Sequence, residues 1–131
     1  MRPLRKKTGV PYWEFEDLVR IITTDHFGPV KSENSLKSAL VKLNRLDDAH
    51  GDLKADNLHE LMRVHEAMNI QQVAKITATA AMARKETRFP PYHYRADFPE
   101  TDDDRYCGLI VIKKGPEGDI TTRFEPLTYD I

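Results

Sequence analysis

The sequence predicts a mainly α fold, in which a three-helix bundle is followed by an arginine-rich turn and a C-terminal β-hairpin. Three stretches place apolar residues three and four positions apart, which is the periodicity of an amphipathic helix. Two short runs of branched and aromatic residues then flank a Gly-Pro turn near the C-terminus, as in a hairpin. The length of 131 residues is typical of one domain.

The composition limits the classes of partner. The net charge of −1 gives no basic field to attract nucleic acid or an anionic membrane. No apolar run approaches the roughly 20 residues that cross a bilayer. The single cysteine, Cys107, excludes an internal disulfide framework and a cysteine-cluster metal site. A reducing, cytoplasmic setting is therefore expected.

Residues 1–10 are read as a basic N-terminal arm, and residues 11–131 as the domain itself. The arm carries Arg2, Arg5, Lys6 and Lys7 without an apolar stretch behind them, unlike a secretory signal. We expect a solvated tail, or else an arm that lies on a partner subunit.

The first helix is expected over residues 11–25, with Pro11 in its first turn and Gly28-Pro29 as its end. Its expected apolar stripe consists of Phe15, Leu18, Val19 and Ile22.

The second helix is expected over residues 33–49, after Ser32 as the N-cap and before Gly51 in a left-handed conformation. Its apolar stripe is Leu36, Leu40, Leu43 and Leu46.

The third helix is expected over residues 57–87, with Asp56 as its cap. Residues at helical spacing form its predicted apolar stripe: Leu58, Leu61, Met62, His65, Met68, Gln72, Ile76 and Ala80.

Two strands are expected over residues 106–114 and 119–126, joined by a turn over residues 115–118. A two-stranded hairpin is only marginally stable in water. We therefore expect it to pack on the helices or to extend another sheet.

Residues 84–106 are the most informative segment, because they mix arginines, carboxylates and aromatic side chains. Ions in partly buried places need partners, and an arginine fork binds a carboxylate through two parallel hydrogen bonds. The segment contains, in order, Glu86-Thr87-Arg88, His93, Arg95, Asp97-Phe98-Pro99 and Asp102-Asp103.

This order of residues resembles the arginine-rich turn in the C-terminal helical domain of the fumarate reductase, succinate dehydrogenase and adenylylsulfate reductase flavoproteins. Fumarate reductases and succinate dehydrogenases usually have a short Gly-Ala-His turn between the two arginines. This chain has the longer turn Phe89-Pro90-Pro91-Tyr92-His93-Tyr94, which is more similar to the adenylylsulfate reductase alpha subunits. The resemblance covers roughly residues 12–127.

The resemblance implies a detached C-terminal domain or small subunit of an FAD-dependent oxidoreductase. It implies FAD on a partner flavoprotein chain and an iron–sulfur cluster on an electron-transfer subunit, with no cofactor, metal or catalytic residue on this chain. The sequence agrees in one respect, since its six glycines form no G-x-G-x-x-G set for a dinucleotide.

Two interpretations of the turn stay open. The charged residues Arg84, Glu86, Arg88, Arg95 and Asp97 could form an internal salt-bridge network that fixes the turn. Alternatively, the turn could support the active site at a contact with the flavin-binding and capping domains. The candidate residues for that contact are Glu86, Arg88, Phe89, Tyr92, His93, Tyr94, Arg95 and Asp97.

The alternative function is an autonomous protein–protein interaction module without a redox role. Nucleic-acid binding through the arm and the turn is disfavoured by the near-neutral charge.

Overall fold

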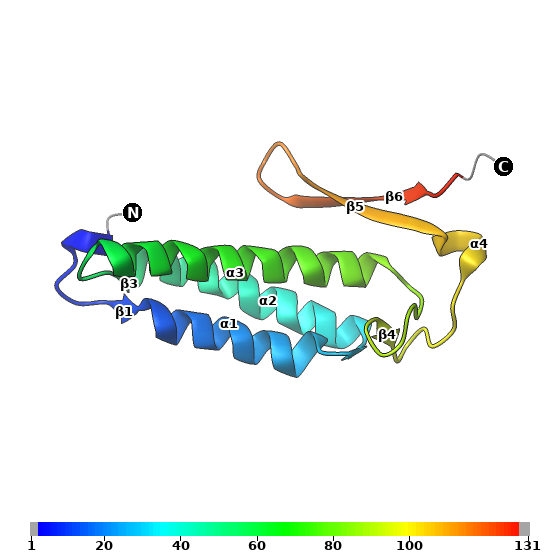
Figure 1. The fold of residues 1–131 in the computed structure, drawn as a ribbon, viewed down its shortest axis with the longest axis horizontal. Coiled ribbons are helices and arrows are strands. Elements are labelled where there is room, and N and C mark those ends of the chain that lie inside the picture. Colours follow the sequence, from blue (N-terminus) through cyan, green and yellow to red (C-terminus); the bar gives the residue numbers. More distant parts are fainter. Residues whose placement is uncertain (1–2, 129–131) are drawn as a thin grey trace.

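The computed structural model describes residues 3–128 as three long helices followed by a short helix and a hairpin (Figure 1). Helix α1 spans Tyr12–Phe27, α2 spans Glu33–Ala49 and α3 spans Leu58–Ala83. They run alternately in opposite directions, and each contacts the other two. The predicted mainly α fold with a C-terminal β-hairpin is confirmed. Residues 1–2 of the expected arm and 129–131 of the expected domain lie outside the described part.

The core lies between the three long helices. Fully or almost fully buried are Phe15, Val19, Leu36, Ala39, Leu43, Val64, Ala67 and Ala78. The α3 side of this core is formed mostly by alanines, whose small side chains allow the helices to approach closely. Packing in the core places the C-terminus of α3 near the N-terminus of α2, and the arginine-rich turn contacts both of these helix ends.

The predicted helix starts need two corrections. Pro11 is the extended N-cap of α1, with ψ of 151°, rather than a residue of its first turn. Ser32 caps α2 through a reciprocal capping box with Ser35. At α3 the cap is Asn57 rather than Asp56, because the Asn57 side chain accepts a hydrogen bond from the Glu60 N–H at 2.9 Å. The Glu60 carboxylate in turn accepts the Asp56 N–H at 2.9 Å, so Asp56 lies just outside the helix.

Helix α3 ends at Ala83, four residues before the predicted end. Arg84 is extended, with ψ of 104°, and its N–H still donates to the Ala80 carbonyl. The chain leaves the helix here because the Arg95 guanidinium takes up carbonyls of the last turn, a tertiary contact that helix propensity does not reveal.

The predicted apolar stripe of α3 is wrong in part. The face buried against α1 and α2 is formed by Val64, Ala67, Gln71, Ala74 and Ala78. Leu58 and Met62 of the predicted stripe are 75% and 49% exposed. The sequence is ambiguous because α3 has apolar residues on two sides.

Two smaller expectations also need correction. Leu18 lies at the edge of the buried face of α1 and is 48% exposed. Gly51 is not left-handed, because among the described residues positive φ occurs at Gly118 and Phe89. After α2 the chain instead continues into a 3₁₀ turn, His50–Asp52.

The N-terminal segment packs on the chain's own helices from residue 3 onward. Pro3 is buried, and its carbonyl accepts the Ala55 N–H at 3.2 Å. The Lys6 amine donates to the Gly51 carbonyl. Strand β1, Val10–Pro11, pairs in parallel with β3, Leu53–Lys54. The solvated-tail interpretation is therefore wrong for Pro3 and for Val10–Pro11, whereas Leu4 and residues 7–9 are exposed.

Two further strand pairs complete the fold. Strand β2, Val30–Lys31, pairs in parallel with β4, Tyr94–Arg95, and so joins the start of α2 to the arginine-rich turn. After α4, Asp103–Tyr106, strands β5, Gly108–Lys114, and β6, Ile120–Pro126, form the antiparallel hairpin. The hairpin returns along α3 (Figure 1). Across residues 3–128, no helix combines the length and apolar character that a bilayer crossing requires.

Candidate functional site

The arginine-rich turn lies at the end of the bundle where α3 finishes and α2 begins (Figure 1). Its charged side chains form what we call the ionic network: Arg84, Glu86, Arg88, Arg95 and Asp97. The network has two halves, one centred on Glu86 and one on Arg95.

Glu86 is the centre of the first half, and its side chain is completely buried. Its carboxylate accepts hydrogen bonds from Arg88 Nε at 2.7 Å, Arg88 Nη2 at 2.9 Å and the Asp102 N–H at 2.9 Å. Arg84 Nη1 donates to the same carboxylate. Burial alone would raise the pKa of Glu86, but the hydrogen bonds from Arg88, Asp102 and Arg84 together keep the pKa below its usual value.

The two arginines around Glu86 extend this half toward the hairpin. Arg84 donates to the carbonyls of Tyr106 at 2.9 Å and Gly108 at 2.6 Å. Arg88 donates to Asp103 at 2.7 Å, and hydrogen bonds to Glu86 and Asp103 raise its pKa. The buried carboxylate therefore fixes the start of the hairpin relative to the end of α3.

Arg95 is the centre of the second half and is also fully buried. Its Nη1 donates to the carbonyls of Ala81 at 2.7 Å and Arg84 at 2.8 Å, which otherwise lack donors at the helix end. Its Nε and Nη2 bind Asp97 in a two-bond fork at 2.9 and 2.8 Å. Arg95 thus caps the C-terminus of α3 with a fixed positive charge.

Asp97 connects this cap to α2. Its Oδ2 accepts the Glu33 N–H at 2.8 Å, at the N-terminus of α2. Hydrogen bonding to Arg95 is the main cause that lowers the pKa of Asp97 to about 2. The Arg95–Asp97 pair therefore links the end of one bundle helix to the start of another.

Lys31 is a site residue that sequence reasoning missed. Only 7% of it is exposed, and its Nζ donates to the carbonyls of Pro29 at 3.1 Å and Tyr92 at 3.0 Å. Burial, and then the charge of Arg95, lower its pKa. Lys31 is far from the turn in sequence, and only the β2–β4 pairing brings it there, so no local pattern could have revealed it.

His93 and Tyr94 are half-buried beside this lysine. The His93 carbonyl accepts the Arg88 N–H at 3.0 Å, which closes the turn. Within the described residues, His93 Nε2 is a buried atom without a hydrogen-bond partner. Burial, and then the charges of Lys31 and Arg95, lower the pKa of the imidazole and so disfavour its protonated form.

The turn's remaining aromatic candidates lie outside the network. Phe89 is 76% exposed and Tyr92 is 83% exposed. We call residues 89–92, Phe89-Pro90-Pro91-Tyr92, the aromatic tip. Phe89 adopts a φ of +50°, an uncommon value for a bulky side chain, and its carbonyl accepts the Tyr92 N–H at 2.9 Å. The charged residues thus bind one another, as the first of the two interpretations of the turn expected, and Phe89 and Tyr92 are exposed to solvent.

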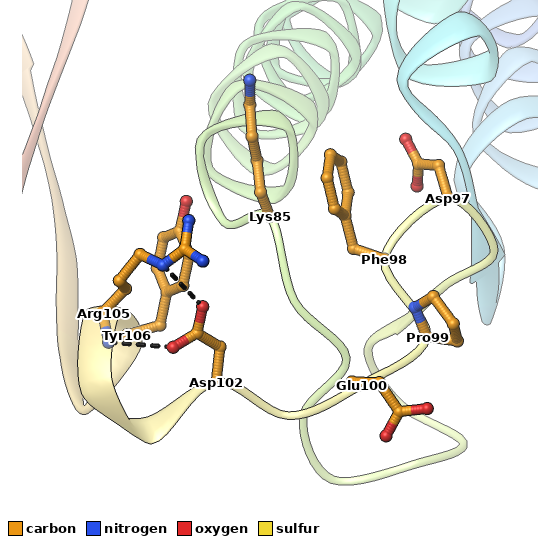
Figure 2. Close-up of a pocket in the computed structure, with 8 residues that line it drawn as sticks. All are labelled: Lys85, Asp97, Phe98, Pro99, Glu100, Asp102, Arg105 and Tyr106. Atoms are coloured by element: carbon orange, nitrogen blue, oxygen red, sulfur yellow. Dashed lines mark hydrogen bonds and ion pairs between the residues drawn. The ribbon is translucent and has the colours of Figure 1, made fainter.

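A hollow of about 350 Å³ lies beside the network, between the end of α3 and α4 (Figure 2). Phe98 and Tyr106 stand on opposite sides of it, with Lys85 between them. Three carboxylates line it, and two of them already have partners: Asp97 binds Arg95 at 2.8 Å, and Asp102 binds Arg105 at 3.0 Å, while Glu100 is exposed. The hollow therefore offers no free pair of acidic groups for acid–base chemistry.

The starts of α2 and α3 do not fit an FAD cradle, which needs a glycine-rich turn with free N–H groups at a helix start. At α2 the first-turn N–H groups of Glu33 and Ser35 are bound by Asp97 and Ser32. At α3 the Glu60 N–H is bound by Asn57. In the part of the chain described, moreover, no three His, Cys, Asp or Glu side chains are grouped as a metal ion requires.

Comparisons with known proteins identify the family. Residues 16–131 match the family described as the fumarate reductase flavoprotein C-terminus. An uncharacterised FAD-dependent oxidoreductase of Methanocaldococcus jannaschii is 36% identical over 98 residues, which is 75% of this chain and 17% of the relative. The adenylylsulfate reductase alpha subunit of Megalodesulfovibrio gigas is 27% identical over 121 residues, or 87% of this chain and 18% of the relative.

A solved structure shows the same fold. Adenylylsulfate reductase from the hyperthermophile Archaeoglobus fulgidus superposes with a TM-score of 0.85 at 27% identity, over 96% of this chain and 21% of that chain. The chain spans less than a fifth of the length of the two curated relatives above. The predicted resemblance, including that to the adenylylsulfate reductase alpha subunits, is confirmed. The chain belongs to the family of fumarate reductase flavoprotein C-terminal domains.

Proposed function

We propose that this chain serves as the C-terminal domain, or a separate small subunit, of an FAD-dependent oxidoreductase of the fumarate reductase, succinate dehydrogenase and adenylylsulfate reductase kind. It completes the flavoprotein and helps to dock the electron-transfer partner. In this proposal FAD is held by the flavin-bearing part and the iron–sulfur cluster by the electron-transfer subunit, in the cytoplasm. The chain itself carries out no chemical step.

The observation that carries the proposal is the aromatic tip. Large aromatic side chains that are 76% and 83% exposed are characteristic of the centre of a protein interface. A rigid support reduces the entropy that binding costs, and here the ionic network, with its buried Glu86 and Arg95, fixes the turn on both sides of the tip.

In this proposal the ionic network acts by holding the turn in place. Glu86, Arg88, Arg95 and Asp97 bind one another and the backbone, which supports a role in holding the turn rather than in chemistry. His93 and Tyr94 support the tip from the half-buried side of the turn. These residues are therefore proposed as positioning residues at the contact with the flavin-bearing part.

The test is affinity purification of the tagged full chain from its native source, with an absorption spectrum of the eluate. We expect a flavin band at about 450 nm, which is characteristic of that cofactor, and a second chain if the flavin-bearing part is a separate subunit. The double variant Phe89→Ala/Tyr92→Ala should recover at least tenfold less flavin. The matched control is Trp13→Ala, which removes a 53% exposed aromatic group at the other end of the bundle.

Circular dichroism of both variants checks that each is folded. A colourless, solitary wild-type chain would refute the proposal and favour the alternative of an interaction module without a redox role. Equal flavin recovery by wild type and double variant would remove the aromatic tip from the interface.

A further inference from the structure

Helix α3 has apolar residues on two opposite faces. One face is buried against α1 and α2 through Val64, Ala67, Ala74 and Ala78. We call the opposite face, which carries Leu58, Met62 and Val73, the outer face of α3; these residues are 75%, 49% and 60% exposed. A helix that is apolar on both sides is normally covered on both sides.

The hairpin covers only part of this helix. Strands β5 and β6 contact α3 and run back along it from the C-terminal end (Figure 1). On the outer face there is a shallow hollow of about 410 Å³, lined by Glu66, Asn69, Ile70 and Val73. Its one charged lining residue, Glu66, is already paired with Arg63. An apolar surface without unpaired charge suits a permanent interface better than a transient one.

We infer that the outer face of α3 is a second docking surface for the flavin-bearing part of the flavoprotein, separate from the aromatic tip. This inference rests on the function proposed above. It adds that the flavin-bearing part holds the domain at two places, at the end of the bundle and along its side.

The size of the face argues against a second copy of the chain that binds through this face alone. The stretch from Leu58 to Val73 is about 22 Å long, and a helix with side chains is about 10–12 Å wide, so the face offers roughly 250 Å². A stable interface buries about 800 Å² on each partner. The occupant must therefore cover other parts of the domain at the same time.

The flavin-bearing part meets this requirement. The matched region amounts to 17% and 18% of two curated relatives, so most of each relative lies outside it. A partner of that size can cover the outer face and the aromatic tip together, and the two contacts would then reinforce each other.

The experiment compares two valine substitutions in the tagged full chain. Val73→Asp places a charge in the outer face of α3, whereas Val41→Asp places the same charge on α2; the two valines are 60% and 52% exposed. Both variants should stay folded by circular dichroism, because neither valine is in the core. We expect Val73→Asp to lower the flavin recovered per mole of chain at least tenfold, and Val41→Asp to leave it within twofold of wild type.

The outcomes separate the two proposals. If wild type and Val73→Asp recover flavin equally, the second docking surface is refuted while the proposed function stands. If wild type recovers no flavoprotein, both are refuted. If light scattering shows a dimer of the isolated chain that Val73→Asp dissociates, the face joins two copies and our assignment of its occupant is wrong.

Discussion

The substitution Arg95→Met tests whether the ionic network holds the bundle together. Arg95 makes three hydrogen bonds to carbonyls at the end of α3, at 2.7, 2.8 and 3.5 Å, and two to Asp97, at 2.9 and 2.8 Å. Methionine fills most of the arginine's volume but supplies no donor. The substitution therefore removes hydrogen bonds and charge without leaving a large cavity.

The magnitude follows from the groups left behind. Each carbonyl that loses its donor in a buried place costs about 1–3 kcal/mol. The Asp97 side chain is 28% exposed, so water compensates part of its loss. Breaking a buried ion pair from one side typically costs about 3–5 kcal/mol, and we expect a loss in this range. For a chain of 131 residues this lowers Tm by roughly 10–18 °C.

The assay is urea and thermal unfolding, followed by far-ultraviolet circular dichroism, which reports helix content. The matched control is Arg123→Met in the hairpin. Arg123 also binds a carboxylate two residues later, Glu125 at 2.9 Å, but its side chain is 59% exposed. The control should cost less than about 1 kcal/mol. Equal effects of the two substitutions would refute the view that burial and helix capping make Arg95 important.

Two further predictions concern pH. Because Arg95 lowers the pKa of Asp97 to about 2 from 3.8, this carboxylate stabilises the fold above pH 3.8, and the contribution disappears as pH falls toward 2. After allowance for solvent screening, this contribution to the free energy of unfolding is about 1–2 kcal/mol. In urea unfolding, wild type should therefore be more stable than Asp97→Asn at pH 6, and the difference should shrink by pH 2. A difference that stays constant with pH would contradict the linkage. For His93, burial and the charges of Lys31 and Arg95 lower the pKa below 6.5, so protonation favours the unfolded chain and stability falls as pH drops below 6.5. Lys31→Met should raise the His93 pKa in an NMR titration, whereas the exposed Lys113→Met should leave it unchanged; no difference between them would mean that Lys31 does not act on the imidazole.

The sequence determined much of the fold because its local signals are strong. The bounds of α2 were predicted without error, since Ser32 supplies an N-cap and leucines recur on one face. The hairpin turn was predicted because residues 115–118 begin and end with glycine, and Gly118 adopts the positive φ of 87° that glycine readily accepts. The ordered residues from Glu86 to Asp103 also carried the resemblance that the comparisons confirmed.

Other features were decided only by the tertiary structure. The early end of α3 depends on Arg95, which reaches back to its last carbonyls, and such a contact between distant residues leaves no trace in helical periodicity. Lys31 joins the turn only because β2 pairs with β4. The buried face of α3 could not be chosen from sequence, because apolar residues lie on both sides and only packing against α1 and α2 selects one. Local chemistry thus determined where the elements form, and long-range burial of charge and apolar surface decided how they end and which faces remain exposed.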